Sequence, residues 1–591
     1  MCGFAGEFAT RRSPDREAVE RMAATMVDRG PDGSGAWAQG PVALAHRRLK
    51  IIDLSSAGDQ PMVDAELGLT VVFNGCIYNH HELRRELERA GYRFFSTSDT
   101  EVILKAHSHW GPRCVERFAG MFAFALYEHE SHRLFLTRDR LGIKPLYLTE
   151  VSGGLRFAST LPALLAGGGV DTELDPVALH HYLTWHAAVP APRTILKGVH
   201  KLAPATVMTV EADGRSSTET YWRADYRRQE KYAGWTAEDW AQAVLAALRT
   251  AVERRTVSDV PVGVLLSGGL DSSLIVGLLA ESGQRGLATF SVGFDGIGEH
   301  EGDEFEFSDL IAKEFETDHR QIHVPVDRLL GSLDGAIGAM SEPMVSHDTV
   351  AFYLLAEEVS HSHKVVQSGQ GADEVFGGYF WYPPLLDADG TGADAYEKVF
   401  FDRPHAEMGS VLEPRYLVSE DPSRAFLDEQ FGEPGADGPL DRALRLDTEV
   451  MLVEHPVKRV DNMTMAWGLE ARTPFLDHEL VELAAACPPE LKLADGGKGV
   501  LKAASRGVVP DAVIDRPKAY FPVPAFYKLE GPTLDLIRET FEESAVRDRG
   551  LFRPEHVTQL LAAPNDHLTT LEGSKLWHIA LLELWLRRHG V

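Results

Sequence analysis

The chain has 591 residues, 44% of them hydrophobic and 25% charged, which suits two to four globular domains and argues against a disordered protein. Its 59 Lys and Arg against 88 Asp and Glu give a formal net charge of −29, which argues against nucleic-acid or membrane-surface binding. The four cysteines form no CxxC pair, so neither a disulfide framework nor a zinc-finger spacing is indicated, and a reducing, cytoplasmic location fits best.

The sequence contains no membrane or targeting signal that we recognise. No apolar run approaches the ~20 residues that cross a bilayer. The first residues, MCGFAGEF, lack a basic segment followed by an apolar one, so no signal peptide is predicted.

The first 215 residues predict strands separated by turns, with a few helices. Short or alternating apolar runs bounded by Gly, Pro or Asp predict strands at 42–45, 69–73, 121–127 and 133–137. Helical spacing predicts helices at 81–90 and 100–109. The chain becomes polar and aperiodic around 213–234. We therefore place a first domain at 1–215, a linker at 216–236 and a second domain at 237–591.

In the second domain, short apolar strands alternate with helices, which predicts an α/β fold with a parallel sheet. Helices are expected at 237–257 and 272–281, and strands at 260–266, 287–294, 321–324 and 364–367. From about residue 400 the pattern is mostly helical. It ends in a helix at 576–588, whose apolar stripe indicates core packing.

A seven-residue loop lies between the strand 260–266 and the next helix: Ser267-Gly268-Gly269-Leu270-Asp271-Ser272-Ser273. Its glycines let backbone amides approach an anion, and the N-terminus of the following helix adds partial positive charge. A plain strand-to-helix turn is the alternative, which the complete pattern in this context disfavours. The loop is similar to the pyrophosphate-binding loop of enzymes that split ATP between the α- and β-phosphates.

A second glycine-rich segment, Ser368–Gly378, follows the strand 364–367. In an open α/β sheet both loops are expected to meet at the carboxyl edge. Asp271 and Asp373 would then share one Mg²⁺ bound to the phosphates of ATP, since this ion prefers hard oxygen ligands. Two solvated aspartates in turns are the simpler alternative.

Cys2 follows the initiator methionine, so removal of Met1 would give one residue both a thiol and a free α-amine. An α-amine titrates near ~7.7–8.0 and a thiol near ~8.5, so the amine can take the thiol proton at neutral pH. A cysteine at this position carries little information by itself. The polar segments that follow it in the same domain strengthen the prediction that Cys2 is a nucleophile whose own α-amine acts as the base.

Those segments are Arg29–Asp32, His46–Leu49, Phe73–Asn79 and Ser98–Glu101. An Asn side chain together with the backbone N–H of the adjoining Gly can form an oxyanion hole. One Arg and one Asp can bind the carboxylate and the ammonium of an amino acid. Each segment alone is also compatible with ordinary turn chemistry, but their combination in one domain is poorly explained that way.

With these motifs, the chain resembles the glutamine-hydrolysing asparagine synthetases of the B type over nearly its whole length. The first domain resembles the class II glutamine amidotransferases, which implies an N-terminal nucleophile (Ntn) hydrolase of the α+β class with helices around two antiparallel sheets. The second resembles the ATP-pyrophosphatase-type synthetase domain, with further matches at Asp461–Met463, Ala466–Asp477 and Lys498–Lys502. The segments Phe73–Asn79, Gly302–Asp309 and Gln367–Pro384 resemble most the N-acetylglutaminylglutamine amidotransferases.

The resemblance implies roles in glutamine hydrolysis for five matched residues. Cys2 would attack the side-chain amide of glutamine, and Asn74 and Gly75 would stabilise the oxyanion. Arg48 and Asp99 would hold the carboxylate and the ammonium of glutamine. The ammonia released would cross a tunnel between the domains.

The resemblance also implies roles in the second domain. Leu265, Val292, Ser368 and Gly369 would bind ATP, and the loop Ser267–Ser273 would bind pyrophosphate. Asp271 and Asp373 would hold Mg²⁺. Lys502 would stabilise charge as the acceptor carboxylate attacks the α-phosphate. The resulting acyl-adenylate and ammonia would give an amide, AMP and pyrophosphate.

Gln370 stands where aspartate-using members of the family carry Glu. A glutamine side chain can neither deprotonate ammonium nor pair with a positive charge. This residue weakens the case for aspartate, and the resemblance implies N-acetylglutaminylglutamine as the acceptor, with aspartate as the alternative. A β-lactam-synthetase-like cyclase would have no use for ammonia, and a non-catalytic glutamine sensor would not need complete motifs in both domains. The expected partners are small molecules, and the family implies a homodimer.

Overall fold

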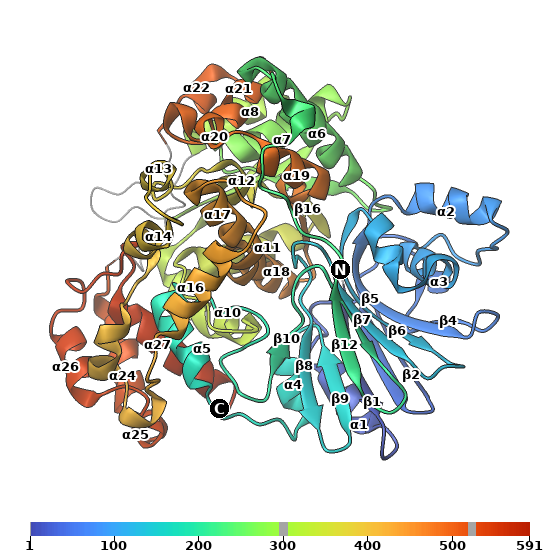
Figure 1. Ribbon diagram of the computed structural model, residues 1–591, viewed down its shortest axis with the longest axis horizontal. Coiled ribbons are helices and arrows are strands. Elements are labelled where there is room, and N and C mark those ends of the chain that lie inside the picture. The colour runs from blue at the N-terminus through green and yellow to red at the C-terminus, as the bar shows by residue number, and fades with distance from the viewer. Residues whose placement is uncertain (1, 295–304, 518–527) are drawn as a thin grey trace.

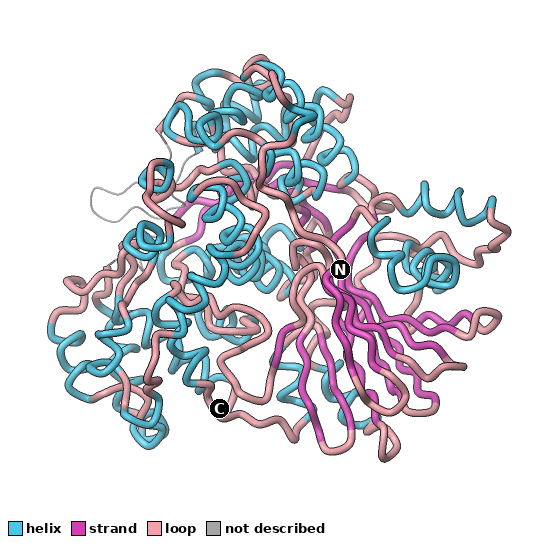
Figure 2. Tube along the Cα trace, in the orientation of Figure 1, coloured by secondary structure: helices cyan, strands magenta, loops and turns pink. Residues whose placement is uncertain are grey.

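The computed structural model describes residues 2–294, 305–517 and 528–591. Strands from the first 220 residues gather in one part of the molecule, and helices around a shorter sheet make up the rest (Figure 1). Figure 2 shows the same division by secondary structure.

Two six-stranded antiparallel sheets form the centre of the first domain. The first sheet has the order β10-β8-β9-β1-β3-β2, and the second has the order β12-β11-β7-β6-β5-β4. The first contains β1 (Gly3–Ala9), β2 (Gly33–Gln39), β3 (Val42–Arg48), β8 (Tyr147–Val151), β9 (Gly154–Ala158) and β10 (His200–Lys201). The second contains β4 (Met62–Asp64), β5 (Leu69–Ile77), β6 (Gly120–Glu128), β7 (Leu134–Arg138), β11 (Thr206–Val210) and β12 (Ser216–Thr220).

The first domain has four layers. Phe4, Phe8 and Val72 belong to a buried apolar cluster between the two sheets. Helices α1 (Arg16–Ala24) and α4 (Leu161–Gly167) cover the outer face of the first sheet, and α2 (His80–Arg89) and α3 (Asp99–Trp110) cover that of the second. The helix–sheet–sheet–helix arrangement agrees with the fold class that the sequence predicted.

The last strand of this domain lies inside the segment predicted as a linker. Strand β12 pairs with β11 from Ser216 to Thr220, five residues beyond the predicted domain end. All five of its side chains are exposed, so no apolar alternation marked it in the sequence. Helix α6 (Ala237–Arg254) begins where the second domain was predicted to begin, with a capping box between Thr236 and Asp239.

A five-stranded parallel sheet lies at the centre of the second domain, in the order β15-β14-β13-β16-β17. Its strands are β13 (Val262–Leu265), β14 (Ala288–Phe294), β15 (Asp318–Val324), β16 (Val365–Gln367) and β17 (Glu470–Arg472). Four of them were predicted, and β17 was not. Two of the three residues of β17, Glu470 and Arg472, are charged, so no apolar run marked it as a strand.

The helices that surround this sheet continue to the end of the chain. Those not yet named are α5 (Pro176–Thr184), α7 (Leu270–Glu281), α8 (Phe305–Glu314), α9 (Val326–Gly331), α10 (Leu333–Ala339), α11 (Asp348–Ser360), α12 (Ala372–Phe376), α13 (Pro383–Leu386), α14 (Ala393–Phe400), α15 (Met408–Val411), α16 (Pro422–Gly432), α17 (Pro439–Leu446), α18 (Lys458–Met465), α19 (His478–Ala486), α20 (Pro489–Leu493), α21 (Gly499–Ser505), α22 (Asp511–Ile514), α24 (Gly531–Glu542), α25 (Ser544–Arg549), α26 (Pro554–Ala562) and α27 (Lys575–Arg588). Among the helices described, none is both long and apolar enough to cross a membrane.

Buried contacts of two kinds join the domains. Leu49 and Met121 of the first domain share an apolar cluster with Val264 and Leu266 of the second. Buried charges also cross the interface, because Asp461 accepts hydrogen bonds from Arg29 Nη1 at 2.9 Å and from Lys144 Nζ at 3.1 Å. Helix α5 belongs to the first domain in sequence but lies among helices of the second (Figure 1).

Candidate active sites

A small cavity of about 30 Å³ lies where the two domains meet. Cys2, Arg48, Gly75 and Asp99 line it, and the sequence predicted all four as glutamine-site residues. The first domain thus brings together residues that are up to 97 positions apart, counted from Cys2 to Asp99.

Cys2 directly precedes β1 and is buried, with 7% of its surface exposed. Its Sγ lies 4.0 Å from the carbonyl oxygen of Leu49, and its backbone N–H donates to Asn74 Oδ1 at 3.2 Å. Burial raises the pKa of the Cys2 thiol. The thiol is therefore protonated at neutral pH and needs a neighbouring base to become a nucleophile.

Asn74 and Gly75 lie on β5, beside the cysteine. Asn74 is fully buried, and its Nδ2 has no hydrogen-bond partner among the described residues. A Cβ at Gly75 would lie 2.2 Å from the carbonyl oxygen of Met121, so only glycine fits this close approach to β6. A buried, unsatisfied amide donor next to a cysteine is the feature that an oxyanion hole requires.

Backbone groups hold Arg48 and Asp99 in the wall of the cavity. Arg48 ends β3, and its Nη1 donates to the Ser55 carbonyl at 2.8 Å and to Asp59 Oδ1 at 2.5 Å. Asp99 begins α3 and accepts a hydrogen bond from the Ile77 N–H at 3.0 Å. Burial raises the pKa of Asp99 to about 6. Its carboxylate is ionised at neutral pH but becomes protonated in mild acid.

Strand β17 of the second domain closes the same cavity with two residues that the sequence analysis missed. Glu470 and Arg472 line the cavity and form a buried ion pair, with Nε 2.6 Å from Oε1. Burial works against the charge of Glu470, but neighbouring cations, Arg472 among them, hold its pKa down at about 2. The available signal was the spacing of Glu470 and Arg472, two positions apart in an otherwise apolar segment, which places both on one face of a strand.

A second cavity, of about 750 Å³, opens at the carboxyl ends of β13, β14 and β16. The predicted residues that line it are Leu265, Ser267, Gly269, Asp271, Ser272, Val292, Ser368, Gly369, Asp373 and Lys502. Two predicted residues do not line it. Ser273 is fully buried in α7, and Gly268, with φ +74°, packs against Phe307 and Ser308.

The two glycine loops meet as the sequence predicted. A Cβ at Gly369 would lie 2.9 Å from the Cβ of Asp271, so the second loop can approach the first only with glycine there. Lys498 then joins the two aspartates, with its Nζ 2.7 Å from Asp271 Oδ2 and 2.9 Å from Asp373 Oδ1. Burial works against the charge of Lys498, but the two carboxylates outweigh it and raise the pKa of the lysine.

The two lysines of the segment Lys498–Lys502 have different environments. Lys502 donates to the carbonyl oxygen of Asp495 at 2.5 Å, and burial lowers its pKa. The resemblance implied a role only for Lys502, and no local pattern in the sequence indicates that Lys498 lies between the two aspartates. Residues 302–304 of the segment Gly302–Asp309 lie outside the described residues, as does Met1.

Residues outside the two glycine loops also line the large cavity. Gln370 lines the cavity and accepts a hydrogen bond from Arg459 Nη2 at 3.3 Å. Arg459 Nη1 also donates to Asp348 Oδ1 at 2.9 Å. The cavity wall also includes histidine and aromatic side chains: His186, Tyr379, Trp381, His455, Trp577 and His578.

Comparison with known proteins assigns a family to each part of the chain. Residues 1–222 match the family described as glutamine amidotransferase domain, and residues 243–587 match asparagine synthase. Glutamine-hydrolysing asparagine synthetase 1 of Bacillus subtilis is 31% identical, over 99% of this chain and 96% of its own length. Glutamine-hydrolysing asparagine synthetase 3 of the same organism is 30% identical, over 88% of this chain and 87% of its own length.

Proposed function

The chain belongs to the asparagine synthase family and is a glutamine-hydrolysing carbon–nitrogen ligase, and we propose that it amidates a carboxylate through an acyl-adenylate. The observation that carries the proposal is the pair of cavities joined by β17. One contains a cysteine beside an unsatisfied amide donor, and the other contains two glycine loops at the carboxyl edge of a parallel sheet. The first suits amide hydrolysis and the second suits a nucleotide.

In the small cavity, Cys2 is the nucleophile after removal of Met1. Its α-amine takes the thiol proton, and Sγ attacks the side-chain amide carbon of glutamine. Asn74 Nδ2 and the Gly75 N–H stabilise the oxyanion, while Arg48 and Asp99 hold the carboxylate and the ammonium of glutamine. The amide nitrogen takes up a proton and leaves as ammonia. Water then cleaves the thioester and releases glutamate.

Ammonia reaches the second cavity through the domain interface. Leu49, Cys76 and Met121 share a buried apolar cluster with Val264 and Leu266, which lie on or beside β13. An apolar path keeps ammonia neutral and therefore nucleophilic, because burial disfavours the charged ammonium ion.

In the large cavity, Leu265 and Val292 pack against the nucleotide, and Ser368 and Gly369 lie beside it. The loop Ser267–Ser273 binds the pyrophosphate. The acceptor carboxylate attacks the α-phosphorus of ATP, and pyrophosphate leaves. Lys502 stabilises the charge that develops in this step. Ammonia then attacks the acyl carbon of the adenylate, loses a proton and expels AMP, which leaves the amide.

Asp271 and Asp373 fit a Mg²⁺ ion. Both carboxylates lie within 3 Å of one cation, Lys498 Nζ, and both provide the hard oxygen atoms that Mg²⁺ prefers. When bound, Mg²⁺ neutralises charge on the phosphates of ATP. Lys498 supplies part of the same positive charge from the protein itself and holds the two loops together.

We propose N-acetylglutaminylglutamine as the acceptor. Histidine and aromatic side chains line the large cavity together with Gln370, and such a wall suits an acylated dipeptide better than a small amino acid. Gln370 carries no charge to pair with the free ammonium of aspartate. Aspartate is the second candidate, because two relatives that match this chain over most of their length carry the name asparagine synthetase.

One assay separates the acceptors. Purified protein is incubated with ATP, Mg²⁺ and glutamine, together with either N-acetylglutaminylglutamine or aspartate, and the amide and AMP are measured by mass spectrometry. We expect amide from the dipeptide and AMP in equal amount. Amide from aspartate alone would contradict the acceptor and leave the ligase proposal intact. Absence of AMP with both would contradict the acyl-adenylate route for these acceptors.

We also propose that the enzyme is cytoplasmic and forms a homodimer. All four cysteines are free and buried, which is consistent with a reducing, cytoplasmic location. The family resemblance supports a homodimer, which light scattering of the purified protein would test.

A further inference from the structure

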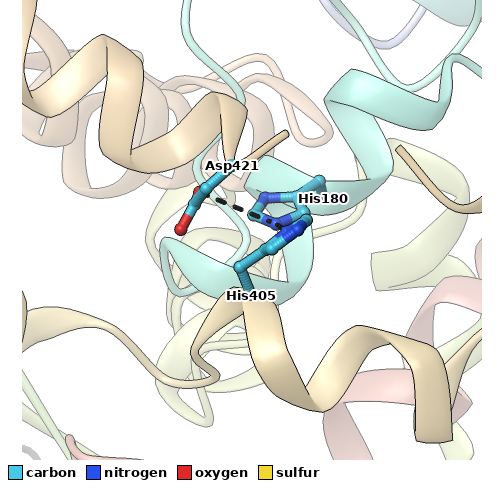
Figure 3. A group of neighbouring side chains, drawn as sticks. All are labelled: His180, His405 and Asp421. Atoms are coloured by element: carbon cyan, nitrogen blue, oxygen red, sulfur yellow. Dashed lines mark hydrogen bonds and ion pairs between the residues drawn. The ribbon is translucent and has the colours of Figure 1, made fainter. Parts of the chain in front are cut away.

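Three side chains that can bind a metal ion converge where α5 meets the second domain: His180, His405 and Asp421 (Figure 3). His180 lies on α5, His405 begins a short 3₁₀ helix (His405–Glu407), and Asp421 is the N-cap of α16. The three residues come from separate segments and lie outside both cavities described above. Neither proposed reaction uses them.

The distances suit a small coordination sphere. His180 Nε2 lies 3.0 Å from His405 Nδ1 and 3.8 Å from Asp421 Oδ1, and one ligand atom from each residue lies within 4.8 Å of the others. In a tetrahedral zinc site with bonds of about 2.0–2.1 Å, neighbouring ligand atoms are about 3.3 Å apart. The first two separations lie on either side of that value.

Contacts behind these atoms orient two of the ligands. His180 Nδ1 lies 2.8 Å from the hydroxyl of Ser423, which is fully buried. A proton on Nδ1 that donates to Ser423 leaves the lone pair of Nε2 directed at the other two ligands. Asp421 Oδ1 accepts hydrogen bonds from the backbone N–H groups of Ser423 at 3.1 Å and Arg424 at 2.9 Å. These bonds fix the carboxylate, with Oδ1 as the oxygen that lies 3.8 Å from His180 Nε2.

The chemistry of the ligands selects the ion. Two imidazoles and one carboxylate suit Zn²⁺ rather than Mg²⁺, which prefers oxygen ligands only. His180 is almost fully buried, but His405 and Asp421 are partly exposed, so the ion has an entry path and water can fill the fourth position. Without an ion, the two ring nitrogens 3.0 Å apart must share a single proton.

We propose that His180, His405 and Asp421 bind one Zn²⁺ ion, which ties α5 to the second domain. Helix α5 ends at Thr184, whose carbonyl accepts the Asp402 N–H at 2.8 Å. His186 follows two residues later, lines the large cavity and lies 3.0 Å from Asp402 through its Nδ1. The ion therefore stabilises the interdomain contact that supports one wall of this cavity, without contact to the reacting groups.

The test uses the full-length chain. The protein is stripped with a chelator, dialysed and titrated with Zn²⁺, and bound zinc is counted by mass spectrometry. In parallel, Co²⁺ is added as a spectroscopic probe. We expect one zinc per chain, a visible Co²⁺ absorption band typical of tetrahedral coordination, and a Tm that rises by a few degrees with Zn²⁺.

Two variants and one control locate the ion. His405→Ala removes a ligand and is expected to lose the cobalt band and the Tm shift. Asp421→Asn keeps an N-cap for α16, so the fold is retained, and is expected to weaken zinc binding at least about tenfold. His361→Ala changes an exposed histidine after α11 and is expected to match the unaltered protein. Zinc binding that persists unchanged in both variants, or no binding above the background of the stripped protein, would overturn the proposal.

Discussion

The residues that line the two cavities are held in place in different ways. In the small one, backbone groups help to fix both charged residues of the first domain: the carbonyl of Ser55 holds Arg48 alongside Asp59, and the N–H of Ile77 holds Asp99. In the large one, side chains hold one another, since Lys498 bridges Asp271 and Asp373. A site fixed by backbone keeps its geometry before the substrate arrives. A site held by long side chains can exchange partners when a nucleotide and an ion enter.

The largest expected effect comes from Cys2→Ala, which distinguishes most sharply between the activity of the small cavity and that of the large one. Without the thiol there is no thioester, so glutamine-driven amide formation should fall by at least about 10³-fold. Ammonium-driven amide formation should stay within about twofold, because the large cavity is unchanged. Both rates are measured by AMP release at saturating nitrogen source. Retained activity with glutamine would show that Cys2 is not the nucleophile.

The reciprocal change is Asp373→Asn in the large cavity. It removes one of the two carboxylates proposed to hold Mg²⁺ and should reduce amide formation about 10²-fold with glutamine and with ammonium alike. Glutaminase activity, measured as glutamate release, should persist. Asp389→Asn, at an exposed loop aspartate, serves as the matched control. Equal loss of glutamate release in Asp373→Asn would mean that the two cavities do not work as separable sites.

The smallest expected effect is a pH dependence confined to the small cavity. Burial raises the pKa of Asp99 from 3.8 to about 6, and only the ionised carboxylate can hold the ammonium of glutamine. Lowering the pH through 6 protonates Asp99, so the KM for glutamine should be about tenfold higher at pH 5 than at pH 8. Glutamate release across this range gives the KM. A flat profile would remove Asp99 from glutamine binding.

The sequence predicted much of both cavities because their residues sit in local patterns. Cys2, Asn74 and Gly75 lie in short recognisable segments, and the glycine loops follow strands that apolar runs identify. The parallel sheet then brings those loops together, as Gly369 against Asp271 shows. The order of parallel strands determines where their carboxyl ends meet, so this part of the site follows from the fold class.

The missed residues depend on contacts across long stretches of chain. Glu470 reaches the cavity of Cys2 only because β17 pairs with β16 at the domain interface, and no local pattern reports that pairing. Lys498 faces the aspartates because the turn before α21 directs it there. Strand β12 was assigned to the linker because its side chains are polar and exposed, although its backbone completes a sheet.

Strand β17 limits how the two halves of the chain can be separated. Its side chains Glu470 and Arg472 close the glutamine cavity, while the carbonyl of Arg472 accepts the N–H of Ser368, the first residue of the second glycine loop, at 2.8 Å. A fragment that ends after β12 therefore lacks one wall of its own pocket. The first domain is not a portable module, and exchanging it between related enzymes would require β17 to be exchanged with it.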